Sequence, residues 1–169
     1  MNFFSDIRRL LIVLWLGAAC FFSFAVAPSA FAVLPTRESA GAIVSQTLAI
    51  VNYSGFVTGL ILLASSFVGR AFANRLQLLT ERFLLIVLAL ACAVGQFVIA
   101  TWISIVKGQI GRPIDEIAVD DPLRIQFNNL HQYSVWALIA AMLAALIAYF
   151  LMNRTRAVTP LEKQDVKYN

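Results

Sequence analysis

Four long apolar segments limit what this chain can fold into more than any other feature. They lie at residues 10–34, 40–68, 83–106 and 130–152. About 20 apolar residues in a helix cross the roughly 30 Å hydrocarbon layer of a bilayer, and each segment is long enough. Only 13% of the residues are charged, about half the share found in soluble proteins. The sequence therefore predicts an all-α, multi-pass protein of the plasma membrane or an inner membrane.

These four segments leave little chain for a soluble domain. We expect residues 1–152 to form a single four-helix transmembrane bundle and residues 153–169 to form a polar cytoplasmic tail. The basic residues flank the apolar segments and do not alternate with aromatic ones, so anionic lipid head groups explain them better than nucleic acid does. The two cysteines, Cys20 and Cys92, fall inside apolar segments, where a thiol usually serves as a small packing residue.

The N-terminus has two features of a secretory signal peptide. Arg8 and Arg9 precede an apolar run, and Ala30-Phe31-Ala32 fits a cleavage pattern. The run of residues 10–34 is, however, longer than the roughly 7–15 residues of a signal sequence. We therefore expect a retained first helix.

The distribution of positive charge predicts the orientation. Nine Lys and Arg residues fall in the N-terminal tail, the connection at residues 69–82 and the C-terminal tail, whereas four fall in the other two connections. Because cytoplasmic loops are enriched in Lys and Arg, we expect an up-down-up-down bundle with both termini in the cytoplasm.

Small residues mark the faces on which the helices should pack. Gly55 and Gly59 form a GxxxG pattern, which lets a neighbouring backbone approach closely. We expect that neighbour to come from the same chain, with a homodimer seam as the alternative. On the fourth segment, bulky residues from Trp136 to Phe150 gather on one side and should face lipid or a partner subunit. The alanines that gather on the opposite side, and should face protein, are Ala137, Ala140, Ala141, Ala144, Ala145 and Ala148.

Two amide side chains fall at the same depth. Asn52 lies near the middle of the second segment and Gln96 near the middle of the third. An amide in hydrocarbon without a hydrogen-bond partner is costly. We therefore predict that Asn52 and Gln96 form an intramembrane polar pair, with a place in a substrate path as the alternative.

A polar strip surrounds the single histidine. Asp121-Pro122 is typical of a helix start, and a helix that begins near residue 122 places His131 at the outer membrane boundary. The loop before this helix is acidic and carries Asp115, Glu116, Asp120 and Asp121. Three interpretations stay open: a solvated helix face, an outer site for an anionic group or the acidic loop, and a ligand for haem or a pigment through one imidazole. One histidine and distant cysteines do not suit a zinc site. The strip consists of Arg124, Asn128, His131 and Ser134.

Two stretches resemble a known family. The first comprises Pro28, Phe31, Leu34-Pro35 and Ala40-Gly41, and the second is FNNLHQYS at residues 127–134. They are similar to the transmembrane protein 205-like family, also described as domain of unknown function 4149. The resemblance implies a four-helix membrane protein without an agreed activity. The asparagine that follows the His and Ser in the family pattern is missing here.

No nucleophile elbow, phosphate loop, zinc spacing or carboxylate pair occurs inside the apolar segments, and we expect no titratable groups positioned there for acid–base chemistry. The sequence thus predicts a protein that is not an enzyme and has no metal or other cofactor. We expect an accessory or scaffolding subunit packed against other membrane protein subunits. The alternatives are handling of a small molecule, ion or lipid through the outer strip, and a haem or pigment subunit that uses His131.

Overall fold

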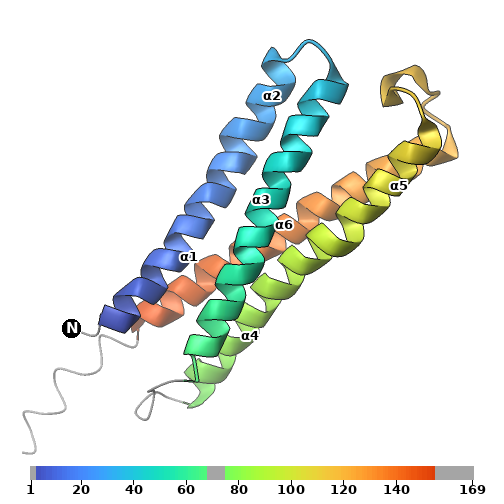
Figure 1. Cartoon of the computed structure of the whole chain (residues 1–169). Coiled ribbons are helices and arrows are strands. Elements are labelled where there is room, and N and C mark those ends of the chain that lie inside the picture. The colour runs from blue at the N-terminus through green and yellow to red at the C-terminus, as the bar shows by residue number, and fades with distance from the viewer. Residues whose placement is uncertain (1–2, 68–74, 155–169) are drawn as a thin grey trace, which may run out of the picture.

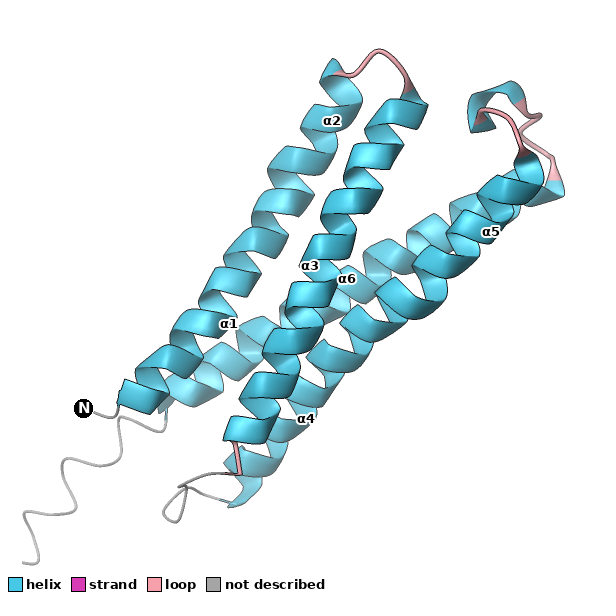
Figure 2. Cartoon of the chain, viewed as in Figure 1, coloured by secondary structure: helices cyan, strands magenta, loops and turns pink. Residues whose placement is uncertain are grey.

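The computed structural model describes residues 3–67 and 75–154. In these residues, helices and short loops make up the whole structure (Figure 2). Four helical stretches are long and apolar enough to cross a membrane: Phe3–Val33, Arg37–Ser65, Arg75–Ile110 and Pro122–Asn153. The chain is therefore a multi-pass membrane protein. Its elements are α1 (Phe3–Phe21), the π-helical turn η1 (Phe22–Val26), α2 (Ala27–Val33), α3 (Arg37–Ser65), α4 (Arg75–Ala93), the π-helical turn η2 (Val94–Ile99), α5 (Ala100–Ile110), the short 3-10 turn η3 (Ile114–Glu116) and α6 (Pro122–Arg154).

Three local signals set the helix ends around the two described loops. The Thr36 hydroxyl caps α3 by accepting a hydrogen bond from the Ser39 amide at 3.1 Å. Gly111 ends α5 with φ +64, a left-handed conformation that favours glycine. Asp121 caps α6, because its Oδ1 accepts from the Leu123 amide at 2.8 Å.

The third helix begins earlier than its apolar segment. It starts at Arg75 and not near residue 83. The polar first turns of α4 are held by contacts to other helices, since Gln77 Nε2 donates to the Leu151 carbonyl at 2.8 Å and Glu81 pairs with Arg8. Hydropathy alone does not register such contacts. The predicted tail at residues 153–169 lies mostly outside the described residues, although Asn153 and Arg154 continue α6.

Two helix pairs diverge towards one end of the molecule. Helix α2 packs on α3, α5 packs on α6, and α4 lies against both α3 and α6. Figure 1 shows the start of α1 and the ends of α3 and α6 gathered near the start of α4, and the α2–α3 pair apart from the α5–α6 pair where the loops at residues 34–36 and 111–121 lie. We call the first the clamped end and the second the splayed end.

The core is a narrow seam of small and large side chains. Gly55 lies so close to α1 and α4 that an added Cβ would stand 2.5 Å from Trp15 Nε1 and 2.6 Å from Cys92 Sγ. At Gly59 the nearest atom would be the Ala89 Cβ at 3.0 Å. Trp15 Nε1 also donates to the Val51 carbonyl at 3.0 Å. Both glycines of the GxxxG pattern thus contact helices of the same chain.

One side of α6 supplies most of its contacts to the bundle. Ala141, Ala144, Ala145 and Ala148 are buried, and Ala137 is half-buried. Ala140 was expected with them but is exposed, since it stands about 100° from Ala141 on the helix. The side chains that α6 turns outward are Trp136, Ile139, Leu143, Leu146, Ile147 and Phe150.

Candidate functional site

Arg124, the first residue of the predicted outer strip, holds the loop before α6. Its Nη1 donates to the Ile117 carbonyl, and the Ile117 side chain is buried. The guanidinium therefore anchors the acidic loop to the first turn of α6. This is the cation that the strip was expected to offer to an anionic group, and it is already hydrogen-bonded to the loop.

His131 lies exposed at the splayed end. Its ring is parallel to that of Phe127, with centroids 6.5 Å apart and planes 8° apart, and Lys107 Nζ lies 5.7 Å from the Phe127 centroid. In the described residues, no three His, Cys, Asp or Glu side chains gather in a way that would hold a metal ion. A haem or pigment on this single imidazole stays a prediction.

The four strip residues differ in their surroundings. Asn128 is exposed, whereas Ser134 is 7% exposed and faces the bundle. Arg124 and His131 share one face of α6, because seven residues correspond to nearly two turns. Met142 continues this face and accepts a hydrogen bond from the Ser23 hydroxyl at 4.0 Å, so the face is turned towards η1. No hydrogen bond or ion pair links two strip residues within the described chain.

An ion pair connects the two helix pairs at the splayed end. Arg37 Nη1 and Asp115 Oδ1 are 3.7 Å apart, and both side chains are exposed. The contact links the start of α3 to η3. An exposed pair at this distance contributes little to stability.

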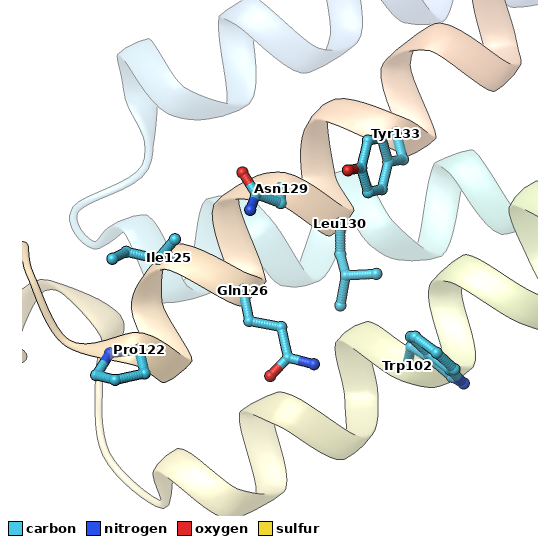
Figure 3. Close-up of a pocket in the computed structure, with 7 residues that line it drawn as sticks. All are labelled: Trp102, Pro122, Ile125, Gln126, Asn129, Leu130 and Tyr133. Atoms are coloured by element: carbon cyan, nitrogen blue, oxygen red, sulfur yellow. The ribbon is translucent and has the colours of Figure 1, made fainter.

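A groove between α5 and α6 was missed by the sequence analysis. It has a volume of about 430 Å³ and lies on the opposite edge of α6 from His131. Figure 3 shows Gln126 and Leu130 directed from α6 towards α5, which carries Trp102. Gln126, Asn129 and Tyr133 recur at helical spacing, which is the signal in the sequence for a polar face on this edge of α6. The lining residues are Trp102, Pro122, Ile125, Gln126, Asn129, Leu130 and Tyr133.

The predicted amide pair lies at one level without forming a hydrogen bond. Asn52 is 4% exposed and packs against η2, where a Cβ added to Gly95 would stand 3.2 Å from Asn52 Nδ2. Gln96 is the next residue along and is half-buried. Asn52 thus contacts the glycine beside its expected partner. Pairing of Asn52 with Gln96 stays a prediction.

A buried ion pair at the clamped end was also missed. Arg8 Nη2 and Glu81 Oε1 are 2.6 Å apart, with side-chain exposures of 6% and 1%. Both residues lie just outside the apolar segments at residues 10–34 and 83–106, so the expectation about titratable groups inside those segments stays a prediction. The signal was present in the spacing, since Arg8 precedes Ile12 and Trp15 on the buried face of α1, and Glu81 precedes Leu85 on that of α4.

Arg82 also links two helices at the clamped end. Arg82 Nε donates to the Ser66 hydroxyl and Arg82 Nη2 to the Ser66 carbonyl, both at 3.1 Å. Its guanidinium carbon lies 4.0 Å from the centroid of the Phe67 ring. Together with Arg8–Glu81 and the Gln77 contact to α6, these bonds tie α1, α3 and α6 to the first turns of α4.

The comparisons with known proteins point to a family. A family model described as "Domain of unknown function (DUF4149)" matches residues 10–112, which cover most of the first membrane-spanning helix and all of the second and third. Residues 127–134 lie beyond the matched range. Neither the curated proteins nor the solved structures contain a match to this chain.

Proposed function

The chain belongs to the family described as domain of unknown function (DUF4149), and on this premise we propose that it is an accessory or scaffolding subunit of a larger membrane assembly. The proposed subunit has no catalytic role. Its task is to present helix faces to other membrane proteins.

The distribution of apolar surface supports this proposal. In the most apolar window of each membrane-spanning helix, only 22–33% of the residues are buried within the chain, so most bulky side chains remain available to lipid and to partner helices. The outward side of α6 offers Trp136, Leu143 and Phe150, opposite the alanines that pack inside. Aromatic residues such as Trp and Phe are enriched at the interfaces between proteins.

The proposal includes an orientation. The clamped end, which carries Arg8 and Arg75, would face the cytoplasm, and the loops at residues 34–36 and 111–121 would lie outside. The excess of Lys and Arg on the first side supports this up-down-up-down arrangement with both termini in the cytoplasm. The resemblance to transmembrane protein 205-like proteins, carried by residues 28–41 and 127–134, is part of the same proposal.

Native electrophoresis of gently solubilised membranes tests the scaffolding role. The wild-type protein is expected to migrate in a band much larger than one or two chains, and substitution of Leu143 and Ile147 by alanine should release it. Ile43→Ala and Ile50→Ala on the exposed part of α3 serve as matched controls. Migration of the wild-type protein alone, at the size of one or two chains, contradicts the proposal.

Handling of a small molecule or ion through the outer strip is a second candidate. It is favoured by the exposed imidazole of His131, since an imidazole can donate or accept a hydrogen bond to a ligand. A screen of ligand-induced thermal stabilisation would support it if a ligand stabilises the wild-type protein and not His131→Ala. Equal stabilisation of both proteins would count against the strip.

A further inference from the structure

The groove between α5 and α6 crosses the expected boundary between water and hydrocarbon. At the end of the groove next to the acidic loop, which we call its upper end, Pro122 starts α6. Tyr133, at its lower end, is eleven residues further, or about 16 Å along the helix. The groove therefore has the length and direction of a lipid molecule entering the bilayer, from head group to upper acyl chain.

Its lining changes character along this length, as Figure 3 shows. Pro122 and Ile125 lie nearest the loop, the amides of Gln126 and Asn129 follow along α6, and the side chains of Leu130, Trp102 and Tyr133 lie deeper. Indole and phenol rings favour the interface because one part of each is apolar and another is polar. An occupant of this groove must therefore be amphipathic.

The polar groups of the groove are available to such an occupant. Thr101 and Ser104, on the same helix as Trp102, donate to their own backbone carbonyls. In contrast, the polar atoms of Trp102, Gln126, Asn129 and Tyr133 form no hydrogen bond with another described residue. Two amides and two ring donors can thus bind the oxygen atoms of a phosphodiester or ester group.

The charge around the upper end selects the head group. The loop at residues 111–121 carries four carboxylates and one arginine. Asp120 and Asp121 directly precede Pro122, whereas the nearby Arg124 is engaged by the Ile117 carbonyl. The two carboxylates beside Pro122 attract a cation at this end of the groove.

We propose that the groove lined by Trp102, Gln126, Asn129 and Tyr133 binds a phospholipid whose head group ends in an ammonium group, such as ethanolamine. The amides hydrogen-bond the phosphodiester oxygens, Asp120 and Asp121 attract the ammonium, and the two rings contact the glycerol and upper acyl region. This lipid would occupy the outer leaflet beside α5 and α6. The site is independent of the scaffolding role and lies on the edge of α6 away from His131.

Tryptophan quenching by brominated phospholipids tests the site. Trp136→Phe removes the other exposed tryptophan, and Trp15 is buried, so lipid-dependent quenching reports on Trp102. The protein is placed in bilayers in which acyl-brominated ethanolamine phospholipid competes with acyl-brominated glycerol phospholipid. We expect about a threefold preference for the ethanolamine lipid, the size that a partly exposed charge interaction supports.

Two sets of variants separate the parts of the proposal. Gln126→Leu with Asn129→Leu should abolish the preference for the ethanolamine lipid. Asp120→Asn with Asp121→Asn should also bring the ratio of quenching by the two lipids to about one, since the carboxylates that distinguish their head groups are lost. Gln132→Leu, an exposed amide of α6 outside the groove, should leave it unchanged. Equal quenching by both lipids, a preference for the glycerol lipid, or a preference that survives either double substitution overturns the proposal.

Discussion

The ion pair between Arg8 and Glu81 is the contact at which a single substitution should affect stability most. Both charges lie on helix faces that otherwise carry core residues. Removal of two charges from water is costly, and their attraction offsets this cost only while both partners are present. Loss of one partner removes this attraction for the charge that stays buried.

Neutralisation of this pair should therefore destabilise the protein. Glu81→Gln is expected to lower the free energy of unfolding by about 3 kcal/mol, as is typical when one partner of a buried pair is removed. Unfolding can be followed in detergent with a thiol-reactive fluorophore, because Cys20 and Cys92 are free. The exchange Arg8→Glu with Glu81→Arg should recover part of the loss.

The exposed pair Arg37–Asp115 supplies the control. Asp115→Asn should change the unfolding temperature little, since exposed ion pairs contribute little. A loss at Asp115 as large as that at Glu81 would contradict the distinction between the clamped and splayed ends.

Gly55 is a second position at which a single substitution should disturb the packing of the core. Gly55→Val should lower the unfolding temperature strongly, because its Cβ would overlap Trp15 and Cys92 and overpacking of a core costs about 1–3 kcal/mol. Gly41→Val on the same helix meets nothing within 4 Å and serves as the control. The result to measure is the difference between the two variants in the same thiol assay, and equal effects would be inconsistent with the close approach of α1 and α4 to Gly55.

At the scale of elements, helix caps and the π-helical turns η1 and η2 set the lengths and directions of the helices. Pro28 lies in the first turn of α2 and has no backbone N–H, so the chain just before it departs from the regular α pattern and forms the π-helical turn η1. Each of the first and third membrane-spanning helices contains such a turn, and beyond these turns α2 and α5 belong to the diverging pairs.

The cap of α6 gives a prediction at this scale. Asp121→Ala removes the acceptor for the Leu123 amide and should cost about 1 kcal/mol, seen as faster hydrogen exchange in the first turn of α6. Asp121→Asn should retain the protection, because an asparagine oxygen also accepts from the helix amides. Asp120→Ala is the matched control, and slow exchange in all three variants would exclude a role for the cap.

At the scale of the whole molecule, polar contacts hold one end of the bundle together and the other end is open. Three contacts from the first turns of α4, through Gln77, Glu81 and Arg82, reach α6, α1 and the end of α3. At the other end, Arg37–Asp115 joins the helix pairs. The bundle is thus anchored where the positive charge is concentrated.

The concentration of Lys and Arg at the clamped end predicts which end of the bundle a thiol reagent reaches from outside the cell. A cysteine introduced at Glu116 should react with a membrane-impermeant thiol reagent in intact cells, whereas one at Arg75 should react only after permeabilisation. Both positions are exposed, and the wild-type protein, whose two cysteines lie within the helices, is the unlabelled control. The reverse pattern would invert the proposed orientation.

Sequence reasoning found the features that depend on residues near one another in the chain. Apolar runs longer than a bilayer requires located the four membrane-spanning helices, and the Asp121-Pro122 pattern located the start of α6. The same reasoning missed the start of α4, since Glu81 and Gln77 are polar and are held by residues more than 70 positions away. The outer strip predicted around His131 lies on one edge of α6, whereas the groove lies on the other.

The sequence by itself determined that this chain crosses a membrane, because helix length, apolar content and caps are local properties that the bilayer converts into structure. Only the tertiary structure decided which polar groups meet. It paired Arg8 with Glu81, placed Asn52 against Gly95 and brought Trp102 beside Gln126 and Asn129. These contacts depend on how the helices rotate and diverge around one another, which is set by side-chain packing across the whole bundle.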